Sequence, residues 1–217
     1  MTRLEIRRRV LQALNDAAVA PVFWSVDEIN ETIAEAQEVL AEEALSLKRT
    51  FMVPRRAGVM IYNLDGIGAN IMAPTRIWLP DLHRRLGVWS LTDLDARHER
   101  WQAVTGDPWV WWPIDWRSFG LWPVPATAGG ILEVDCYVWP DVLPDDSARP
   151  EFPPADHEAL VTYGEIEGYI KQGDVLRALD LAKVWGQRWA DGRYRAGIEQ
   201  IAASFVIRER SHGGGQT

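Results

Sequence analysis

The sequence predicts an α+β protein, in which N- and C-terminal helical segments form one bundle and an antiparallel β-sandwich or barrel-like domain is inserted between them. Three observations support this prediction. Residues 1–49 and 150–210 carry apolar side chains at helical spacing, residues 50–149 consist of short β-branched and aromatic runs separated by proline and glycine, and neither helical segment can bury its apolar stripe alone. Residues 211–217 are polar and glycine-rich, so we expect an extended C-terminal tail there.

The N-terminal segment predicts two helices. An amphipathic stretch over residues 4–17 is followed by a loop over residues 18–24. Ser25 and Glu28 then fit a capping box, because each side chain can accept a hydrogen bond from the backbone amide of the other. The apolar spacing behind this box predicts a helix from about Val26 to Leu47. Its inward-facing residues are expected to be Ile29, Ile33, Ala36 or Gln37, Leu40, Ala44 and Leu47.

The clearest strand of the middle segment runs from Ile131 to Trp139. Its apolar residues alternate, the pair Gly129-Gly130 before it is a turn signal, and Pro140 ends it. The expected core face comprises Leu132, Val134, Cys136 and Val138. Shorter strands are expected over residues 57–64, 71–79, 86–89, 109–112 and 120–122, with a short helix between them that Thr92 would cap.

The C-terminal segment again predicts helices. The pair Pro153-Pro154 is typical of a first helical turn, Gly173 ends that helix, and Asp174 caps the next. The last helix is expected to bury a stripe that consists of Val175, Leu179, Ala182, Trp185, Trp189, Tyr194, Ile198, Ile201 and Phe205.

The net charge of −8 argues against tight binding of nucleic acid, because affinity for phosphates comes largely from basic side chains that displace counterions. A wall past which DNA slides would also need weak binding, so the acidity still permits a DNA conduit. The chain has no run of about 18 or more apolar residues, and we therefore expect no membrane span. The charged N-terminus and the single cysteine are typical of a protein made in the cytoplasm.

We expect no catalytic, cofactor-binding or metal site in this chain. The glycines near Asp65 match neither dinucleotide nor P-loop spacing, and the four histidines form no helical metal-ligand pair. Cys136 falls on the expected core face of its strand, where it would act as a small buried hydrophobe. Asp141, Asp145 and Asp146 lie in a proline-rich loop without calcium-loop spacing, so we interpret them as solvated charge.

Tryptophan is unusually abundant, because the chain has twelve and five of them fall within fourteen residues. One interpretation is an aromatic platform that stacks sugars, which would make the chain a carbohydrate-binding or other recognition module. The other is that some of these rings fill a small β-core while the rest lie at contacts with other subunits or tail components. We favour the second, because a sugar-binding sandwich needs no helical flanks. The residues concerned are Trp109, Trp111, Trp112, Trp116 and Trp122.

The order of these segments resembles the head-to-tail connector (adaptor) proteins of tailed bacteriophages. The resemblance covers about residues 25–190, and it rests on a colinear set of motifs that are individually weak. The set comprises the 26–47 helix with Ala36-Gln37, Leu79-Pro80-Asp81-Leu82, the 94–101 stretch with Trp101, Gly106 and Pro108, Leu121-Trp122-Pro123-Val124-Pro125, Gly129-Gly130, Trp139-Pro140, and residues 153–161 with His157-Glu158-Ala159-Leu160-Val161.

This resemblance implies a structural virion protein without catalysis or cofactors. Such adaptors form a ring, here expected to be dodecameric, that docks below the portal, extends the DNA channel and gives the tail or the next neck protein a platform. It also implies a place in the neck of the virion, between capsid and tail, after synthesis in the host bacterial cytoplasm. The C-terminal segment of such adaptors reaches along the portal, which assigns docking roles to Arg208, Arg210, Ser211, His212, Gly213, Gly214 and Gly215.

Overall fold

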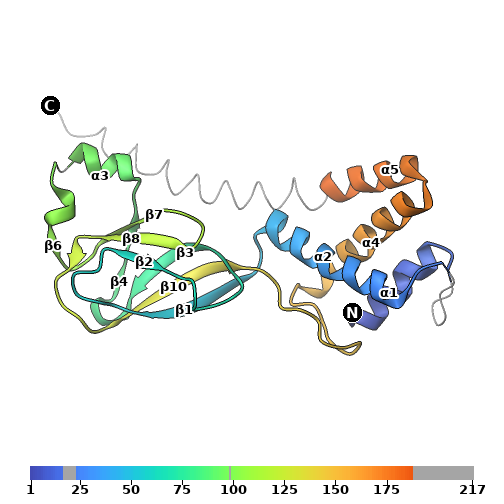
Figure 1. Cartoon of the computed structure of the whole chain (residues 1–217), viewed down its shortest axis with the longest axis horizontal. Coiled ribbons are helices and arrows are strands. Elements are labelled where there is room, and N and C mark those ends of the chain that lie inside the picture. The colour runs from blue at the N-terminus through green and yellow to red at the C-terminus, as the bar shows by residue number, and fades with distance from the viewer. Residues whose placement is uncertain (17–22, 98, 188–217) are drawn as a thin grey trace. The chain divides into compact units, whose positions relative to one another are not determined.

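The computed structural model describes residues 1–16, 23–97 and 99–187, and the chain divides into two compact units (Figure 1). The helical unit combines residues 1–46 with the chain from residue 140 onward, and the β-unit comprises residues 47–139. The expected combination of helices with antiparallel strands is confirmed. Residues 140–149, which we had expected in the β-domain, belong instead to the helical unit.

Within the helical unit, α4 contacts each of the other three helices. Two glycines of α4 let it approach α1 closely. A Cβ added at Gly164 would lie 2.8 Å from the Val10 side chain, and one added at Gly168 would overlap Leu14. The buried core includes Ile6 and Leu11 from α1, Ile29, Ile33 and Leu40 from α2, and Leu160 and Tyr169 from α4. Within its described residues this unit has the helices α1 (Arg3–Ala13), α2 (Val26–Ala44), α4 (His157–Gln172) and α5 (Val175–Trp185), with a 3-10 turn, η3 (Pro154–Asp156), before α4.

The helix ends agree closely with the local signals in the sequence. The Ser25–Glu28 capping box at the start of α2 is present, Gly173 ends α4 in the left-handed conformation with φ of 82°, and the Asp174 side chain accepts a hydrogen bond from the Arg177 amide. However, α2 ends three residues before the expected Leu47, because Leu45 adopts a left-handed φ of 44° and closes the helix. The part of the expected last helix beyond residue 187 lies outside the described residues.

The β-unit is built on two four-stranded sheets, with strand orders β1-β10-β3-β4 and β2-β8-β7-β5, and a two-stranded pair β6-β9. Most pairs are antiparallel, but the short β5–β7 and β6–β9 pairs are parallel, which we had not expected. The strands are β1 (Lys48–Pro54), β2 (Ile61–Asn63), β3 (Ile71–Leu79), β4 (Arg84–Arg85), β5 (Gly87–Val88), β6 (Thr105–Gly106), β7 (Val110–Pro113), β8 (Ser118–Trp122), β9 (Val124–Pro125) and β10 (Ile131–Val138).

Strand β10 lies between β1 and β3, and its core face is the one expected. Leu132, Val134, Cys136 and Val138 are all buried, as predicted from their alternation. The neighbouring strand β1 was not predicted. It pairs with β10 along its whole length, from Lys48 opposite Tyr137 to Pro54 opposite Ile131.

The short helix of the β-unit, α3 (Leu91–Arg97), begins two residues earlier than a cap at Thr92 would allow. The Ser90 hydroxyl accepts a hydrogen bond from the Asp93 amide at 3.1 Å, and the Asp93 carboxylate accepts one from the Ser90 amide at 3.0 Å. Ser90 therefore caps this helix, and the prediction that Thr92 does so was wrong. Two further 3-10 turns in this unit are η1 (Pro80–Leu82) and η2 (Trp101–Ala103).

The second sheet, β2-β8-β7-β5, carries buried side chains on both faces. Trp111 points into a cluster that also contains Phe119 of β8 and the core face of β10. Its neighbour Trp112 points the opposite way, into a second cluster with Trp122. Successive strand residues face opposite sides of a sheet, so consecutive tryptophans can fill two separate cores. The other members of the second cluster are Trp89, Leu94, Trp101 and Val110.

Candidate functional site: interaction surfaces

The structure divides the tryptophan cluster of the sequence into buried and exposed members. Trp111, Trp112 and Trp122 are buried within their own chain, so we correct their assignment as interface residues: they fill the two cores described above. Trp109 is 38% exposed and Trp116 is 74% exposed. The predicted contact with a partner is therefore restricted to these two residues.

Trp109 and Trp116 do not lie side by side. The Trp109 amide donates to the Trp122 carbonyl at the open end of the β7–β8 hairpin, whereas Trp116 lies in the turn that joins the two strands. The strand between them spans about 13 Å at ~3.3 Å per residue. Trp109 instead packs edge-on against Trp89, with 4.9 Å between ring centroids. This separation gives no support to a sugar-stacking platform made from these two rings.

The turn of the β7–β8 hairpin, residues 113–117, is called here the hairpin tip. Its backbone is fixed by two hydrogen bonds to the Ser118 carbonyl, from the Ile114 amide at 3.0 Å and the Asp115 amide at 3.3 Å. The Asp115 carboxylate also accepts a 2.8 Å hydrogen bond from the Arg117 amide. That bond is the main reason why the pKa of the Asp115 carboxyl is lowered. The carboxylate thus stays charged while it holds the turn.

The hairpin tip is also tied to the loop after β2. The Arg117 guanidinium makes a 3.2 Å ion pair with Asp65, and the Arg117 carbonyl accepts a 2.8 Å hydrogen bond from the Leu64 amide. These contacts support the backbone on both sides of Trp116. Ile114, next to it, is 46% exposed. The tip therefore presents two large apolar side chains on a well-ordered turn.

Helix α5 has apolar residues on two sides, and only one side is buried. Ala178 and Trp185 face the helical unit, where the Trp185 indole donates a 3.1 Å hydrogen bond to the Ala159 carbonyl. Of the predicted stripe, Trp185 is buried as expected, but Val175 and Leu179 are exposed. We call the exposed side the outer face of α5, and it consists of Val175, Leu176 and Leu179, of which Leu176 is 79% and Leu179 is 60% exposed. Exposed apolar groups of this size are typical of interaction surfaces.

Helix α2 exposes an acidic stripe along its solvent side. The stripe extends over about 22 Å at ~1.5 Å per residue, and α2 contains no lysine or arginine. The residues repeat at intervals of three or four, so they lie within about 80° of one another around the helix axis. A phosphate backbone would meet repulsion here rather than ion pairs. The stripe consists of Asp27, Glu31, Glu35, Glu38 and Glu42, all exposed.

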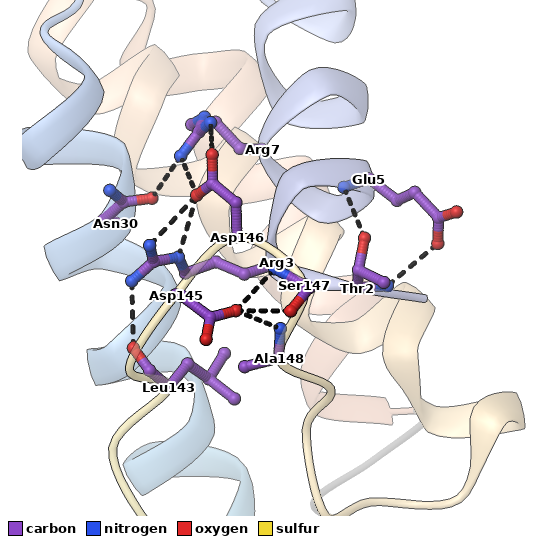
Figure 2. A network of polar contacts seen from close by, with 10 residues as sticks. All are labelled: Thr2, Arg3, Glu5, Arg7, Asn30, Leu143, Asp145, Asp146, Ser147 and Ala148. Carbon is purple, nitrogen blue, oxygen red and sulfur yellow. Dashed lines mark hydrogen bonds and ion pairs between the residues drawn. The ribbon is translucent and has the colours of Figure 1, made fainter.

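A polar network fixes the segment 140–150 to the N-terminal helices (Figure 2). The two oxygens of Asp146 accept hydrogen bonds from Arg7 at 2.8 and 2.6 Å, and Arg3 donates to one of them at 3.0 Å. Arg3 also donates to the Leu143 carbonyl, and Arg7 to Asn30 of α2. The hydrogen bonds from Arg7 are the largest cause that lowers the pKa of Asp146 to about 2.

This network corrects the interpretation of Asp146 as solvated charge, whereas Asp141 and Asp145 are exposed as that interpretation expected. Asp146 joins the loop to α1, and Arg7 connects both to Asn30 of α2. Asp145 accepts hydrogen bonds from the backbone amides of Ser147 and Ala148 and so shapes the turn. The loop is held by its backbone as well, since the Arg3 amide donates to the Ala148 carbonyl at 2.8 Å. These residues have a structural role in the helical unit.

The other residues singled out by the sequence are Cys136, the candidate metal ligands and the predicted docking residues. Cys136 is buried, and burial raises the pKa of its thiol to about 12. In the described part of the chain, no group of three histidine, cysteine or acidic residues could hold a metal ion, and no helix is both long and apolar enough to cross a bilayer. The predicted docking residues from Arg208 to Gly215 lie outside the described residues.

Comparison with known proteins identifies the family. A model of the SU10 adaptor protein family matches residues 1–210, which is nearly the whole chain. This chain belongs to the SU10 adaptor protein family. The resemblance to phage head-to-tail adaptors is thereby confirmed, and the SU10 adaptor family assigns the chain a structural adaptor role in a phage. A search of curated proteins found no match. An adaptor acts through its surfaces, so the hairpin tip and the outer face of α5 are the candidate functional sites.

Proposed function

We propose that this protein forms a dodecameric ring below the portal of a tailed phage. In this role it extends the DNA channel and gives the tail, or the next neck protein, its docking platform, without catalysis. It is made in the host bacterial cytoplasm and becomes part of the virion neck. The match of the adaptor family over residues 1–210 carries this proposal. Two exposed apolar surfaces, the hairpin tip and the outer face of α5, support it, because such surfaces favour association.

DNA passes through the proposed channel without being held. The net charge of −8 and the acidic stripe on α2 support this part of the proposal. Tight binding of duplex DNA requires basic side chains that release counterions from the phosphates, and an acidic surface has the opposite effect. Weak interaction suits a channel through which the genome must slide.

The C-terminal segment attaches each subunit to the portal in this proposal. Arg208 and Arg210 suit an acidic docking partner, and Gly213-Gly214-Gly215 allow backbone conformations and close approaches that other residues do not. Ordering a segment of about ten residues costs on the order of 10–20 kcal/mol of conformational entropy. Individual contacts cannot offset that cost, so docking depends on the copies in the ring acting together.

The test is the mass and shape of the purified protein, with and without its portal protein. We expect light scattering and negative-stain imaging to show rings with twelve times the 24.6 kDa mass of one chain, either for the protein alone or once portal is added. The portal alone and the adaptor alone are the controls. A chain that stays at 24.6 kDa at high concentration and in the presence of portal would refute the proposed ring.

A further inference from the structure

We propose that neighbouring copies contact one another head to tail, with the hairpin tip of one copy packed on the outer face of α5 of the next. This inference rests on the proposed ring and specifies which surfaces join its subunits. The two surfaces are on separate parts of the chain, one on the β-unit and one on the helical unit. Both are apolar; one lies on a turn held by backbone hydrogen bonds and the other on a helix.

The apolar groups of the two surfaces suit one another. The hairpin tip offers one large aromatic ring, Trp116, with Ile114 beside it, and the outer face of α5 offers two leucines and a valine one turn apart. Tryptophan is the residue type most enriched among the energetically dominant residues of interfaces. The turn around Trp116 is already held by its hydrogen bonds and by the Arg117–Asp65 ion pair. Little conformational entropy is therefore lost when the turn binds a partner.

The charges around the two surfaces are also complementary. Asp115 lies beside Trp116 at the tip. Lys183 lies on the same side of α5 as Leu176 and Leu179, seven and four residues after them, and it has no ion-pair partner among the residues that the structure describes. Asp180 lies one turn after Leu176, as Lys183 lies one turn after Leu179. The charges are therefore complementary when the tip sits toward Leu179, where Asp115 meets Lys183.

Symmetric pairing would satisfy these surfaces less well. A contact between two tips would leave the outer face of α5 uncovered, and a contact between two outer faces would leave the tip uncovered. A head-to-tail contact covers both surfaces in every copy, and contacts between two different surfaces are the kind that generate closed rings.

The expected contact is small. One tryptophan buries about 150–250 Å², so the tip on α5 falls well below the ~1,200 Å² of a stable interface. A single contact of this kind is weak, and ring closure makes many of them act together. The subunit should consequently remain monomeric when dilute and assemble over a narrow range of concentration.

Cysteine crosslinking tests the proposed contact in the full-length protein. The variants Trp116→Cys and Leu179→Cys each add one exposed thiol, while the native Cys136 is buried and stays unreactive. After assembly, with portal if it is required, mild oxidation of a mixture of the two variants should give covalent dimers, and the double variant should give a ladder of higher species. Ile61→Cys, on an exposed position of β2, replaces Trp116→Cys in the control mixture and should give none.

The possible outcomes separate this inference from the proposed function. Dimers of Trp116→Cys alone would show tip-to-tip contact, dimers of Leu179→Cys alone would show contact between two α5 helices, and either result overturns the head-to-tail arrangement. Rings that form without the mixed crosslink also overturn it, but they leave the proposed ring intact. If no ring forms with or without portal, the proposed function fails and this inference fails with it.

A second measurement avoids crosslinking. Trp116→Ala should raise the concentration at which rings form by about tenfold or more, because a central interface tryptophan is removed. Its Tm should not change, since the side chain is largely exposed in the monomer. Met52→Ala, an exposed residue of β1, is the matched control and should assemble normally. Unchanged assembly of Trp116→Ala contradicts the inference.

Discussion

Replacing Asp146 by Asn should destabilise the helical unit by about 2 kcal/mol. The substitution keeps the size of the side chain but removes the charge that binds Arg3 and Arg7. Arg7 is almost fully buried, so water cannot replace the lost carboxylate, and only the neutral amide oxygens of Asn30 and of the substituted side chain remain as side-chain acceptors. The cost therefore has two parts: the lost charge interaction and the weaker solvation of a buried guanidinium.

Both parts can be estimated from the structure. Lowering the pKa of Asp146 from 3.8 to about 2 corresponds to about 2.5 kcal/mol in the absence of screening. The carboxylate side chain is 45% exposed, however, so solvent reduces this contribution to about 1 kcal/mol. Leaving the buried Arg7 with poorer acceptors adds about 1 kcal/mol, because an Asn oxygen still accepts one of its hydrogen bonds.

The charge part depends on pH in a defined direction. The folded-state pKa of Asp146 is lowered, so its stabilisation is present above about pH 4, the unfolded-state value, and is lost as the pH falls through about 2. The difference in unfolding free energy between the wild type and Asp146→Asn should therefore be smaller at about pH 3 than at about pH 6.

Urea unfolding followed by far-ultraviolet circular dichroism measures this difference, because helices dominate that signal. Tryptophan fluorescence provides an internal control, since nine of the twelve tryptophans lie in the β-unit, whose unfolding should not change. Asp145→Asn is the matched variant: it removes the same charge one residue away, but an Asn side chain can still accept the hydrogen bonds of the turn. If both variants are equally stable, or if their difference does not depend on pH, the role assigned to Asp146 is wrong.

Four further predictions follow from the fold and the proposed function. Gly120→Ala should lower the unfolding free energy of the β-unit by about 1–3 kcal/mol in urea, because the added methyl group overlaps the Trp112 ring. Gly186→Ala, whose methyl group meets no atom within 4 Å, should be neutral. If Gly120→Ala is as stable as the wild type, the tight packing of this sheet is contradicted. Cys136 should react with a thiol reagent only after unfolding, since its pKa is about 12, and rapid modification of the native protein would disprove its burial. The isolated protein should not shift duplex DNA in a gel at physiological salt, and a salt-dependent shift at micromolar protein would revive a DNA-binding role. Deletion of residues 211–217 should leave the Tm unchanged while weakening attachment to the portal, and docking of undiminished affinity would refute the proposed attachment.

The features that the sequence predicted well are those determined by neighbouring residues. The start of α2 follows from Ser25 and Glu28, three positions apart, and the core face of β10 follows from simple alternation between two turn signals. Gly173 and Asp174 likewise mark the end of one helix and the start of the next. Each of these signals acts through backbone geometry or hydrogen bonds within one or two turns of chain, so no tertiary information is needed.

The features that were missed depend on distant partners. Strand β1 carries Arg49 among its inward positions, which hides its alternation, and the strand is defined by pairing with β10 far along the chain. Asp146 resembles an ordinary loop carboxylate in the sequence, because Arg3 and Arg7, which bind it in the fold, lie about 140 residues before it.

The candidate site could be predicted only in part. The sequence pointed to Trp116 as one of five clustered tryptophans, but only the sheet determines which of them are buried. On α5 the apolar residues surround more than one side of the helix, so periodicity alone cannot decide which side packs inward. Tertiary packing selected the side with Ala178 and Trp185, and left Leu176 and Leu179 exposed.

The division of the helical unit between the two ends of the chain sets an order for folding during synthesis. The β-unit is one continuous stretch, residues 47–139, and it can fold as soon as it leaves the ribosome. Helices α1 and α2 emerge first but must wait for α4, which contacts both of them and ends at Gln172. At ~5–20 residues per second, the 33 residues between the end of the β-unit and the end of α4 take about 2–7 seconds. A chain that ends before α4 lacks the helix that contacts both α1 and α2, so its helical unit cannot be completed.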